Sequence, residues 1–436
     1  MINPGEAAEI VGEEHVHSGA DAARYAVNGV TPTVVAAPGT REEAAALIRR
    51  ARERGWALVA YGGGTQIDTG FPPGKLDLVL STRRLNRVVD YQPDDMTVTV
   101  EPGVTLANLE ETLAGRSQFL PLDPPLPQAA TVGGTVAAAA SGPWRAGFGT
   151  PRDWVIGCRV VGADGQEVRG GGQVVKNVAG YDLPKLYTGS YGTLGLLTEV
   201  TFKVMPRPPA SAVCRVTRLT APMVEALVAR VLHSDLQPTA VELAHDALPF
   251  MAAPETGPPD ANDAAPWRLY FQFMHVQEAV DWQVRQLTSL AMELGGEVER
   301  LIPPAEEAEL QLFRDAPASA PFVVRLGTIS SGVAVVATRV ADLCRRRETV
   351  PRITAHAATG QVHLYGDDAT PAFAADVRAL SRELGISCTF ARLPPECVGQ
   401  VDPWDEPRPE IGLTRAIKNA LDPSGVFSPG RFVGRL

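Results

Sequence analysis

The chain has 436 residues, of which 45% are hydrophobic and 21% charged, and its net charge is −10. This length allows two or three domains with their own cores, and the acidic balance without a long basic block excludes an ordinary nucleic-acid-binding protein. We find no apolar run of about 18 residues and no signal-peptide core, so we expect a cytoplasmic protein without a spanning helix.

The five cysteines are scattered along the chain and none forms a C-x-x-C pair. This pattern indicates a reducing compartment and argues against a zinc or iron–sulfur site built from this chain alone. We interpret each cysteine as a small apolar residue.

The first elements predict a strand–helix–strand unit that ends in a glycine-rich loop. A short strand over 33–37 precedes a helix that begins after Thr40 with a capping box and ends at Gly55. The apolar strand 56–60 then leads into Tyr61-Gly62-Gly63-Gly64-Thr65. Consecutive glycine N–H groups can form a concave site for phosphate or pyrophosphate, although a purely structural turn remains an alternative.

Two common phosphate-binding motifs do not fit this loop. A Rossmann turn opens a helix, whereas here Pro72-Pro73-Gly74 and a strand over 76–80 follow the glycines. A P-loop requires Ser or Thr after its Gly-Lys pair, but Gly74-Lys75 is followed by Leu76.

The rest of the first half predicts further strands and two more segments of small residues. Strands are expected over 96–101 and 196–204, a helix over 106–113, and a hairpin around Asp164-Gly165. The segment 130–140 is rich in Gly and Ala, which indicates a tightly packed helix or close approach to a flat ligand. The prolines of 206–209 predict a linker.

The second half has an α+β pattern. We expect strands over 269–273, 322–326, 333–337 and 361–365, and amphipathic helices near 224–233, 276–294 and 372–384. Residues 252–266 predict a mobile loop, and a further helix is expected over 413–421.

Four motifs together resemble the FAD-binding family typified by vanillyl-alcohol oxidase and p-cresol methylhydroxylase (PCMH). In chain order they are the triple glycine, Thr131-Val132-Gly133-Gly134-Thr135, Gly189-Ser190-Tyr191-Gly192-Thr193-Leu194-Gly195, and Asp422-Pro423-Ser424-Gly425 with Pro429-Gly430. Within the family, Val175-Lys176-Asn177-Val178-Ala179-Gly180-Tyr181-Asp182 is similar to the FAD-binding E subunits of bacterial glycolate oxidases.

The resemblance implies an α+β fold: a PCMH-type FAD-binding domain of two α+β subdomains, plus a ferredoxin-like α+β cap domain. We expect an N-terminal extension over 1–27, the FAD-binding domain over 28–206 and the cap over 207–395. A C-terminal segment, 396–436, would return to the FAD-binding domain.

The resemblance also implies a set of cofactor-binding residues, whereas no catalytic residue is assigned. The glycine loop would wrap the pyrophosphate, the second motif would pass the phosphates and ribityl chain, and the others would lie near the flavin ring or the adenosine. The set comprises Gly62, Gly63, Gly64, Thr65, Gln66, Thr131, Val132, Gly133, Gly134, Ser141, Gly142, Arg145, Gly195, Leu197 and Thr198.

Two departures from the family pattern matter. No histidine lies within 61–74, where covalent members attach the flavin, so we expect non-covalent FAD. The metal-binding pattern H-x-G-D-G-N-x-H of related 2-hydroxy-acid dehydrogenases appears as His356 to His363, with Thr359 in place of the acid. We therefore expect no metal and interpret these histidines as flanking a turn.

The implied function is that of the FAD-binding subunit of a glycolate (2-hydroxy-acid) oxidase or dehydrogenase complex. Its implied partners are a catalytic FAD subunit and an iron–sulfur subunit, with peripheral association at the inner face of the cell membrane through the complex. Two alternatives stay open: a stand-alone FAD-dependent alcohol or 2-hydroxy-acid dehydrogenase, and a catalytically silent FAD-binding assembly subunit.

Overall fold

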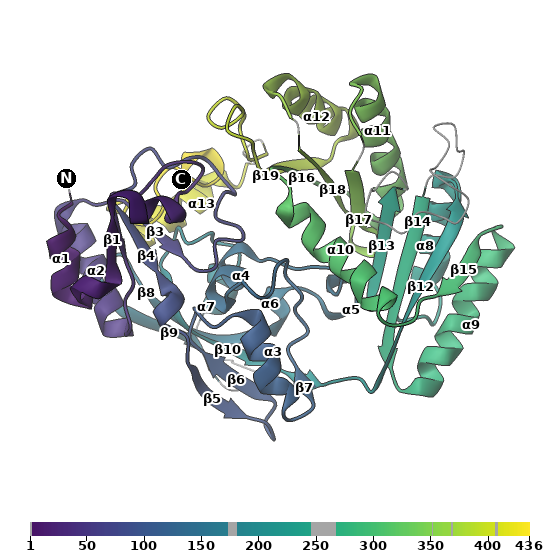
Figure 1. The fold of residues 1–436 in the computed structure, drawn as a ribbon, viewed down its shortest axis with the longest axis horizontal. Coiled ribbons are helices and arrows are strands. Elements are labelled where there is room, and N and C mark those ends of the chain that lie inside the picture. The colour runs from purple at the N-terminus through teal and green to yellow at the C-terminus, as the bar shows by residue number, and fades with distance from the viewer. Residues whose placement is uncertain (1, 173–180, 246–266, 351, 368, 406–408) are drawn as a thin grey trace. The chain divides into compact units, whose positions relative to one another are not determined.

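The computed structural model describes residues 2–172, 181–245, 267–350, 352–367, 369–405 and 409–436 (Figure 1). Its internal contacts divide the chain into unit 1 (Met1–Ser141, Thr150–Arg207 and Asp402–Leu436) and unit 2 (Gly142–Gly149 and Pro208–Val401). The predicted boundaries after residues 27, 206 and 395 stay predictions. The expected loop 252–266 lies outside the described residues, as do most of residues 175–182.

Unit 1 begins with a four-stranded sheet. Its strands, in spatial order, are β1 (Val16–Ser18), β2 (Val34–Ala36), β4 (Leu78–Ser81) and β3 (Leu58–Tyr61). Helices α1 (Pro4–Val11) and α2 (Arg41–Arg54) share a core with this sheet. Thr40 caps α2 by accepting from the Glu43 N–H, and Gly55 ends it in the left-handed conformation, so this predicted helix is confirmed.

A second, five-stranded antiparallel sheet completes the core of unit 1. Its strands, in order, are β5 (Val88–Gln92), β6 (Thr97–Val100), β10 (Leu196–Lys203), β8 (Val155–Val161) and β9 (Glu167–Gly171). The remaining elements are α3 (Leu106–Ala114), β7 (Gln118–Phe119), α4 (Val132–Ala138), α6 (Pro151–Trp154), α7 (Leu183–Tyr187), β11 (Met205–Pro206) and α13 (Ile411–Leu421). The expected hairpin is confirmed, with Gly165 at a φ of 75°.

Unit 2 is built on one antiparallel sheet of eight strands. In spatial order they are β15 (Glu297–Arg300), β12 (Ala210–Leu219), β14 (Trp267–His275), β13 (Ala240–His245), β17 (Arg352–His356), β18 (Gln361–Gly366), β16 (Phe322–Gly327) and β19 (Ser387–Arg392). The helices are α5 (Arg145–Phe148), α8 (Ala221–Leu232), α9 (Gln277–Glu293), α10 (Ala305–Ser319), α11 (Val333–Arg346) and α12 (Pro371–Leu384).

The chain order of unit 2 contains the ferredoxin-like β-α-β-β-α-β unit twice. The first copy runs from β12 to β15 and the second from β16 to β19. The copies join edge to edge through β13 and β17, the second strand of each. Helices α8, α9, α11 and α12 contribute to the core on one face of the sheet, whereas α10 packs on the other face (Figure 1).

The sequence-based prediction of a strand over 333–337 is wrong. These residues begin helix α11 (Figure 1). Three valines in five residues favour a strand, but the buried positions continue as Val336, Val340 and Cys344, a helical spacing. Burial of this apolar face against the sheet outweighs the local preference of β-branched residues.

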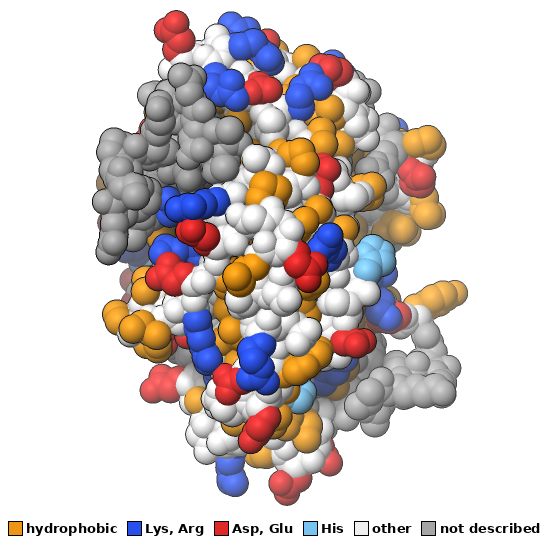
Figure 2. Space-filling model, turned by 90° about the vertical axis from the view of Figure 1, so that its right-hand side faces the viewer, with side chains coloured by type: hydrophobic (Ala, Val, Ile, Leu, Met, Phe, Trp, Pro, Cys, Tyr) orange, Lys and Arg blue, Asp and Glu red, His pale blue; other side chains and the backbone are white. Residues whose placement is uncertain are grey.

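Charged side chains of both signs are interspersed on the face of the molecule drawn in Figure 2. Exposed pairs of opposite charge include Arg230–Glu293 and Arg300–Asp281, at 2.9 and 3.0 Å. None of the helices that the structure describes has both the length and the apolar character needed to cross a membrane.

Candidate cofactor site

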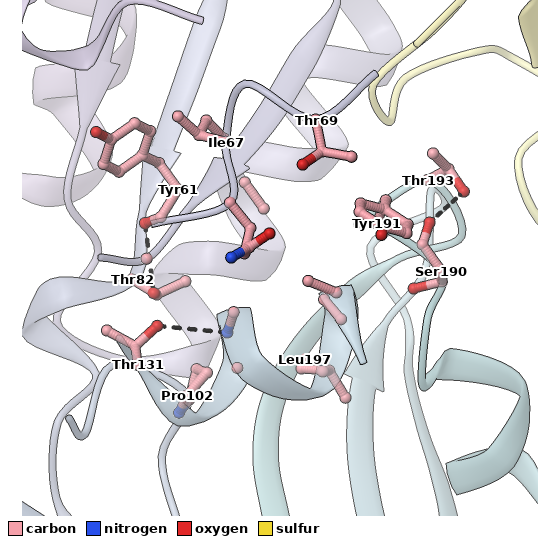
Figure 3. A pocket seen from close by; sticks show the side chains of 18 of the residues that line it. Tyr61, Ile67, Thr69, Thr82, Pro102, Thr131, Ser190, Tyr191, Thr193 and Leu197 are labelled. Atoms are coloured by element: carbon pink, nitrogen blue, oxygen red, sulfur yellow. Dashed lines mark hydrogen bonds between the residues drawn. The ribbon is translucent and has the colours of Figure 1, made fainter. Parts of the chain in front are cut away.

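Unit 1 contains a pocket at the carboxyl end of strand β3, where three of the four sequence motifs meet (Figure 3). The glycine loop supplies one wall, the start of α4 another, and the loop before β10 a third. Its lining is Ala60 to Ile67, Thr69, Thr82, Pro102, Thr131, Gly133, Gly134, Ala137, Ala138, Ser190 to Thr193, Gly195 to Leu197, Trp404, Arg431 and Phe432.

The glycine loop needs its glycines because the neighbouring backbone comes very close. A Cβ on Gly63 would lie 1.8 Å from the Ala129 carbonyl oxygen, and one on Gly62 would lie 2.2 Å from Thr131 Oγ1. Gly64 adopts a φ of 79°, which side chains disfavour. The loop is therefore held closely against the segment that leads into α4.

The backbone N–H groups of this loop have no hydrogen-bond partner in the part of the chain that the structure describes. Among the described residues, the five N–H groups from Gly62 to Gln66 find no hydrogen-bond acceptor, although their residues line the pocket and are only partly exposed. Most partly buried N–H groups in proteins are paired. A row of unpaired N–H groups is a site for an anion such as a pyrophosphate.

The second motif forms the N-terminus of α4. Thr131 is the N-cap, and its Oγ1 accepts from the Gly134 N–H at 3.3 Å (Figure 3). A Cβ on Gly133 would lie 2.6 Å from Pro102 Cβ. Packing against Pro102 therefore requires glycine at position 133. At Gly134 the nearest atom to an added Cβ would be Thr131 Oγ1, at 3.2 Å.

The third motif is held in place by the C-terminal segment. Thr193 Oγ1 donates to the Ser190 carbonyl at 2.7 Å (Figure 3), and the Thr193 carbonyl accepts from Lys418 Nζ at 2.7 Å. Lys418 is buried and also forms an ion pair with Asp422 at 2.6 Å. Burial lowers the pKa of Lys418, and Asp422 acts in the opposite direction.

The fourth motif works as a structural turn. The Asp422 carboxylate accepts from the N–H groups of Val426 and Phe427, at 2.9 and 2.8 Å. This turn directs the chain along β3, where Leu58 exchanges backbone hydrogen bonds of 2.8 and 2.7 Å with Val426 and Ser428. Trp404 and Phe432 line the pocket and contact Tyr191, with ring centroids 5.2 and 5.9 Å away.

The structure brings most of the predicted cofactor-binding residues together. The pocket lining includes Gly62, Gly63, Gly64, Thr65, Gln66, Thr131, Gly133, Gly134, Gly195 and Leu197. Val132 lies instead in the core, and Thr198 sits at an irregularity of β10 with its Oγ1 donating to the Arg159 carbonyl at 3.3 Å. Ser141, Gly142 and Arg145 do not line the pocket. The sequence analysis missed Arg431 and the aromatic residues.

Arg145 belongs to a polar cluster inside unit 2. Its Nη1 donates to Gln361 Oε1 at 2.5 Å. Nearby, on the strand pair that joins the two repeats, His356 Nδ1 lies 2.9 Å from both carboxylate oxygens of Glu242. The ring of His363 lies 5.1 Å from that of His356. Glu242 lies far away in sequence, so the sequence analysis did not find this partner.

Burial dominates the electrostatics of this cluster. It raises the pKa of Glu242 well above its ordinary value and lowers that of His356 to about 3, and the Arg145 charge lowers both. The pKa of His363 is lowered well below its ordinary value, first by burial and then by His356. The histidines are therefore neutral at pH 7. Within the described residues, no three His, Cys, Asp or Glu side chains are arranged to hold a metal ion.

Comparisons with known proteins also indicate a flavin-binding protein. The family model described as "FAD binding domain" matches residues 32–171. The glycolate oxidase subunit GlcE of Escherichia coli (strain K12) is 44% identical over 155 residues, which cover 35% of this chain and 44% of that protein. The D-2-hydroxyglutarate dehydrogenase of Xanthomonas citri pv. viticola is 30% identical over 286 residues, covering 65% of this chain and 60% of that protein.

The chain thus spans less than two thirds of the length of these two relatives. Among solved structures, p-cresol methylhydroxylase with substrate bound is similar, with a TM-score of 0.72 and 18% identity, over 98% of this chain and 95% of that one. At this identity the likeness shows the fold: an α+β PCMH-type FAD-binding domain with an α+β cap, as predicted.

Proposed function

We propose that this FAD-dependent oxidoreductase of the PCMH type is the FAD-binding subunit of a glycolate (2-hydroxy-acid) oxidase or dehydrogenase complex. The observation that carries the proposal is the row of unpaired N–H groups from Gly62 to Gln66 in the unit 1 pocket. The similarity to a glycolate oxidase subunit over 155 residues supports the substrate class and the complex.

The residues of the pocket fit FAD. The glycine loop would hold the pyrophosphate by its N–H groups, and the small residues at the start of α4 would allow the extended cofactor to lie close to the backbone. Among the described residues, neither His nor Cys lines the pocket, so we propose non-covalent attachment. When bound, FAD supplies an acceptor for the hydride from C2 of a hydroxy acid.

Partners would supply what this chain lacks. All five cysteines are buried in apolar surroundings, which raises the pKa of Cys158 to about 12 and that of Cys214 to about 11. Such thiols are poor ligands for an iron–sulfur cluster. We therefore propose that electrons leave to an iron–sulfur subunit, and that a second FAD subunit completes the complex.

A second candidate is a stand-alone 2-hydroxy-acid dehydrogenase, favoured by the Glu242–His356 pair. A histidine oriented by a carboxylate is the usual design of a general base. In that case His356 would hold the proton that leaves the substrate hydroxyl, with Nδ1 turned to Glu242.

The test starts from the purified chain. We expect it to carry flavin, and acid precipitation should release all of it as intact FAD. Flavin that stays on the denatured chain would contradict non-covalent binding. Anaerobic addition of glycolate or D-lactate, with dithionite as the positive control, separates the candidates: rapid bleaching by a hydroxy acid supports the stand-alone enzyme. Co-purification with a cysteine-rich iron–sulfur protein supports the complex.

A further inference from the structure

One charged side chain lines the pocket of unit 1 in the described part of the chain, namely Arg431. All other lining residues are neutral. Arg431 is 6% exposed, and it follows the Pro429-Gly430 end of the fourth motif. A buried cation in an otherwise neutral pocket calls for a counter-charge, because burying an uncompensated charge is strongly unfavourable.

The protein satisfies only part of this guanidinium. Nε donates to the Phe71 carbonyl at 3.2 Å, and Nη2 lies near three acceptors: the Ile67 carbonyl at 2.5 Å, Asn28 Oδ1 at 3.0 Å and the Thr69 carbonyl at 3.3 Å. Nη1 has no acceptor anywhere among the described residues. The unsatisfied end of a nearly buried cation is therefore available to whatever occupies the pocket.

The backbone around Arg431 is fixed on several sides. Its carbonyl accepts from the Phe71 N–H at 3.0 Å and from Trp404 Nε1 at 2.9 Å, and its own N–H donates to the Ser428 carbonyl at 3.3 Å. Three of the carbonyls bound by the side chain belong to the segment that directly follows the glycine loop. The guanidinium is therefore positioned before any ligand arrives.

The charge persists at neutral pH. Burial lowers the pKa of Arg431 to about 10, and the carboxylate of Asp68 acts in the opposite direction. Asp68 Oδ1 accepts a hydrogen bond from the Asn28 N–H at 2.9 Å, so the backbone satisfies part of the Asp68 carboxylate.

We infer that Arg431 is the counter-cation for the pyrophosphate of the cofactor and makes the pocket selective for dinucleotide flavin. This inference rests on the proposed FAD site. The N–H groups of Gly62 to Gln66 surround the anion with partial charges, and Arg431 Nη1 supplies a full one. Charge-assisted hydrogen bonds of this kind are about twice as strong as neutral ones. Riboflavin, which lacks phosphate, would gain nothing from Arg431.

The test compares ligands with and without a pyrophosphate. The intact chain, stripped of flavin, is titrated with FAD, riboflavin and ADP at increasing KCl. In the unsubstituted protein, FAD and ADP affinity should fall with salt while riboflavin affinity stays flat. Arg431→Met should weaken FAD and ADP on the order of tenfold to a hundredfold and flatten their salt dependence, with riboflavin changed less than about threefold.

Two further variants separate charge from structure. Arg431→Lys keeps the cation and should retain the salt dependence even if lost carbonyl contacts lower its melting temperature. Arg83→Met is the matched control, because exposed Arg83 approaches Gly62 O at 3.5 Å without lining the pocket, and its FAD affinity should match the parent.

The outcomes are distinct. Equal FAD and ADP affinity in the parent and Arg431→Met, or equal weakening of all three ligands, would overturn the role of Arg431. A salt-independent FAD affinity in the parent would do so without any variant. A parent chain that binds no FAD at all would refute the proposed function instead.

Discussion

At the scale of single residues, the glycines of the pocket have different tasks, which the sequence alone does not distinguish. A side chain at Gly63 would collide with the Ala129 carbonyl, so this glycine reflects contact between two protein segments. A side chain at Gly134 would instead approach a side-chain atom, Thr131 Oγ1, at 3.2 Å, a closer contact than usual but not a collision with backbone.

This difference predicts that two alanine substitutions differ in their effect on stability. Gly63→Ala should displace the loop and destabilise the chain by about 1–3 kcal/mol, as overpacking does, with FAD affinity falling as well. Gly134→Ala should cost less stability than Gly63→Ala, because the helix preference of alanine offsets part of its close contact with Thr131 Oγ1, and it should weaken FAD binding. Thermal unfolding and flavin titration of both variants check this. Normal FAD binding and stability in Gly63→Ala would contradict the observed contact.

Arg431 is a pocket residue that the sequence motifs did not identify. The D-P-x-G and P-G residues were recognisable, but they build the turn that carries the chain along β3. Arg431, the charged residue that lines the pocket among the described residues, is the next one along the chain. What marks it is burial without full pairing, and burial is a property of the folded chain.

At the scale of elements, helices were easier to predict than the strands of unit 2. The capping residues Thr40 and Gly55 delimit α2 on local signals alone. By contrast, β12, β13, β15, β17 and β19 were not predicted, and 333–337 was assigned to a strand although it is helical. Strand pairing is non-local, and the internal repeat becomes visible only once the sheet order is known.

The Glu242–His356 pair lies where the two repeats join, and it makes unit 2 sensitive to acid. Burial lowers the pKa of His245 to about 4 and that of His356 to about 3, against 6.5 when unfolded, and it lowers the pKa of His363 well below 6.5. At pH values between the folded and the unfolded pKa of each histidine, the unfolded chain binds more protons than the folded chain. Stability is therefore lost as pH falls below 6.5. Glu242, with its raised pKa, acts in the opposite sense above pH 4.5.

We expect each such histidine to contribute about 2 kcal/mol of destabilisation at pH 5 relative to pH 8. Urea unfolding at both pH values, with hydrogen exchange of the β13 and β17 amides, measures the effect locally. His356→Gln should reduce the pH dependence, whereas His233→Gln, at an exposed position on the C-cap of α8, should not. An unchanged pH dependence in His356→Gln would show that the folded chain does not hold His356 neutral.

At the scale of the whole molecule, the sequence predicted the class of cofactor, but it did not predict whether this chain or a partner subunit carries out the oxidation. Ordered motifs brought together from three distant segments form one pocket in unit 1, and this much follows from the fold that they resemble. Whether the chain oxidises a substrate by itself depends on a base. The chain has seven histidines. Among the described residues, His15 lies 3.5 Å from the exposed carboxylate of Glu14, whereas His356 is paired with the buried carboxylate of Glu242.

That pair is poorly suited to act as a base in the isolated chain. His356 is 3% exposed and its pKa of about 3 leaves it a weak proton acceptor. We therefore predict that the purified chain reduces a dye with glycolate or D-lactate at no more than about a thousandth of the rate of the assembled complex. This deficit corresponds to about 4 kcal/mol of barrier, the size expected when a general base is missing. Co-expression with the partner subunits should restore the rate.

The same measurement on His356→Gln decides between the two candidate functions. If the chain serves as a subunit, its residual rate should be unchanged by the substitution, because another protein supplies the base. If the isolated parent instead turns over rapidly and His356→Gln abolishes that activity while keeping its FAD, the stand-alone dehydrogenase is the correct function. His233→Gln serves as the control in both cases, since the exposed imidazole of His233 is hydrogen-bonded to the Ala229 carbonyl of its own helix.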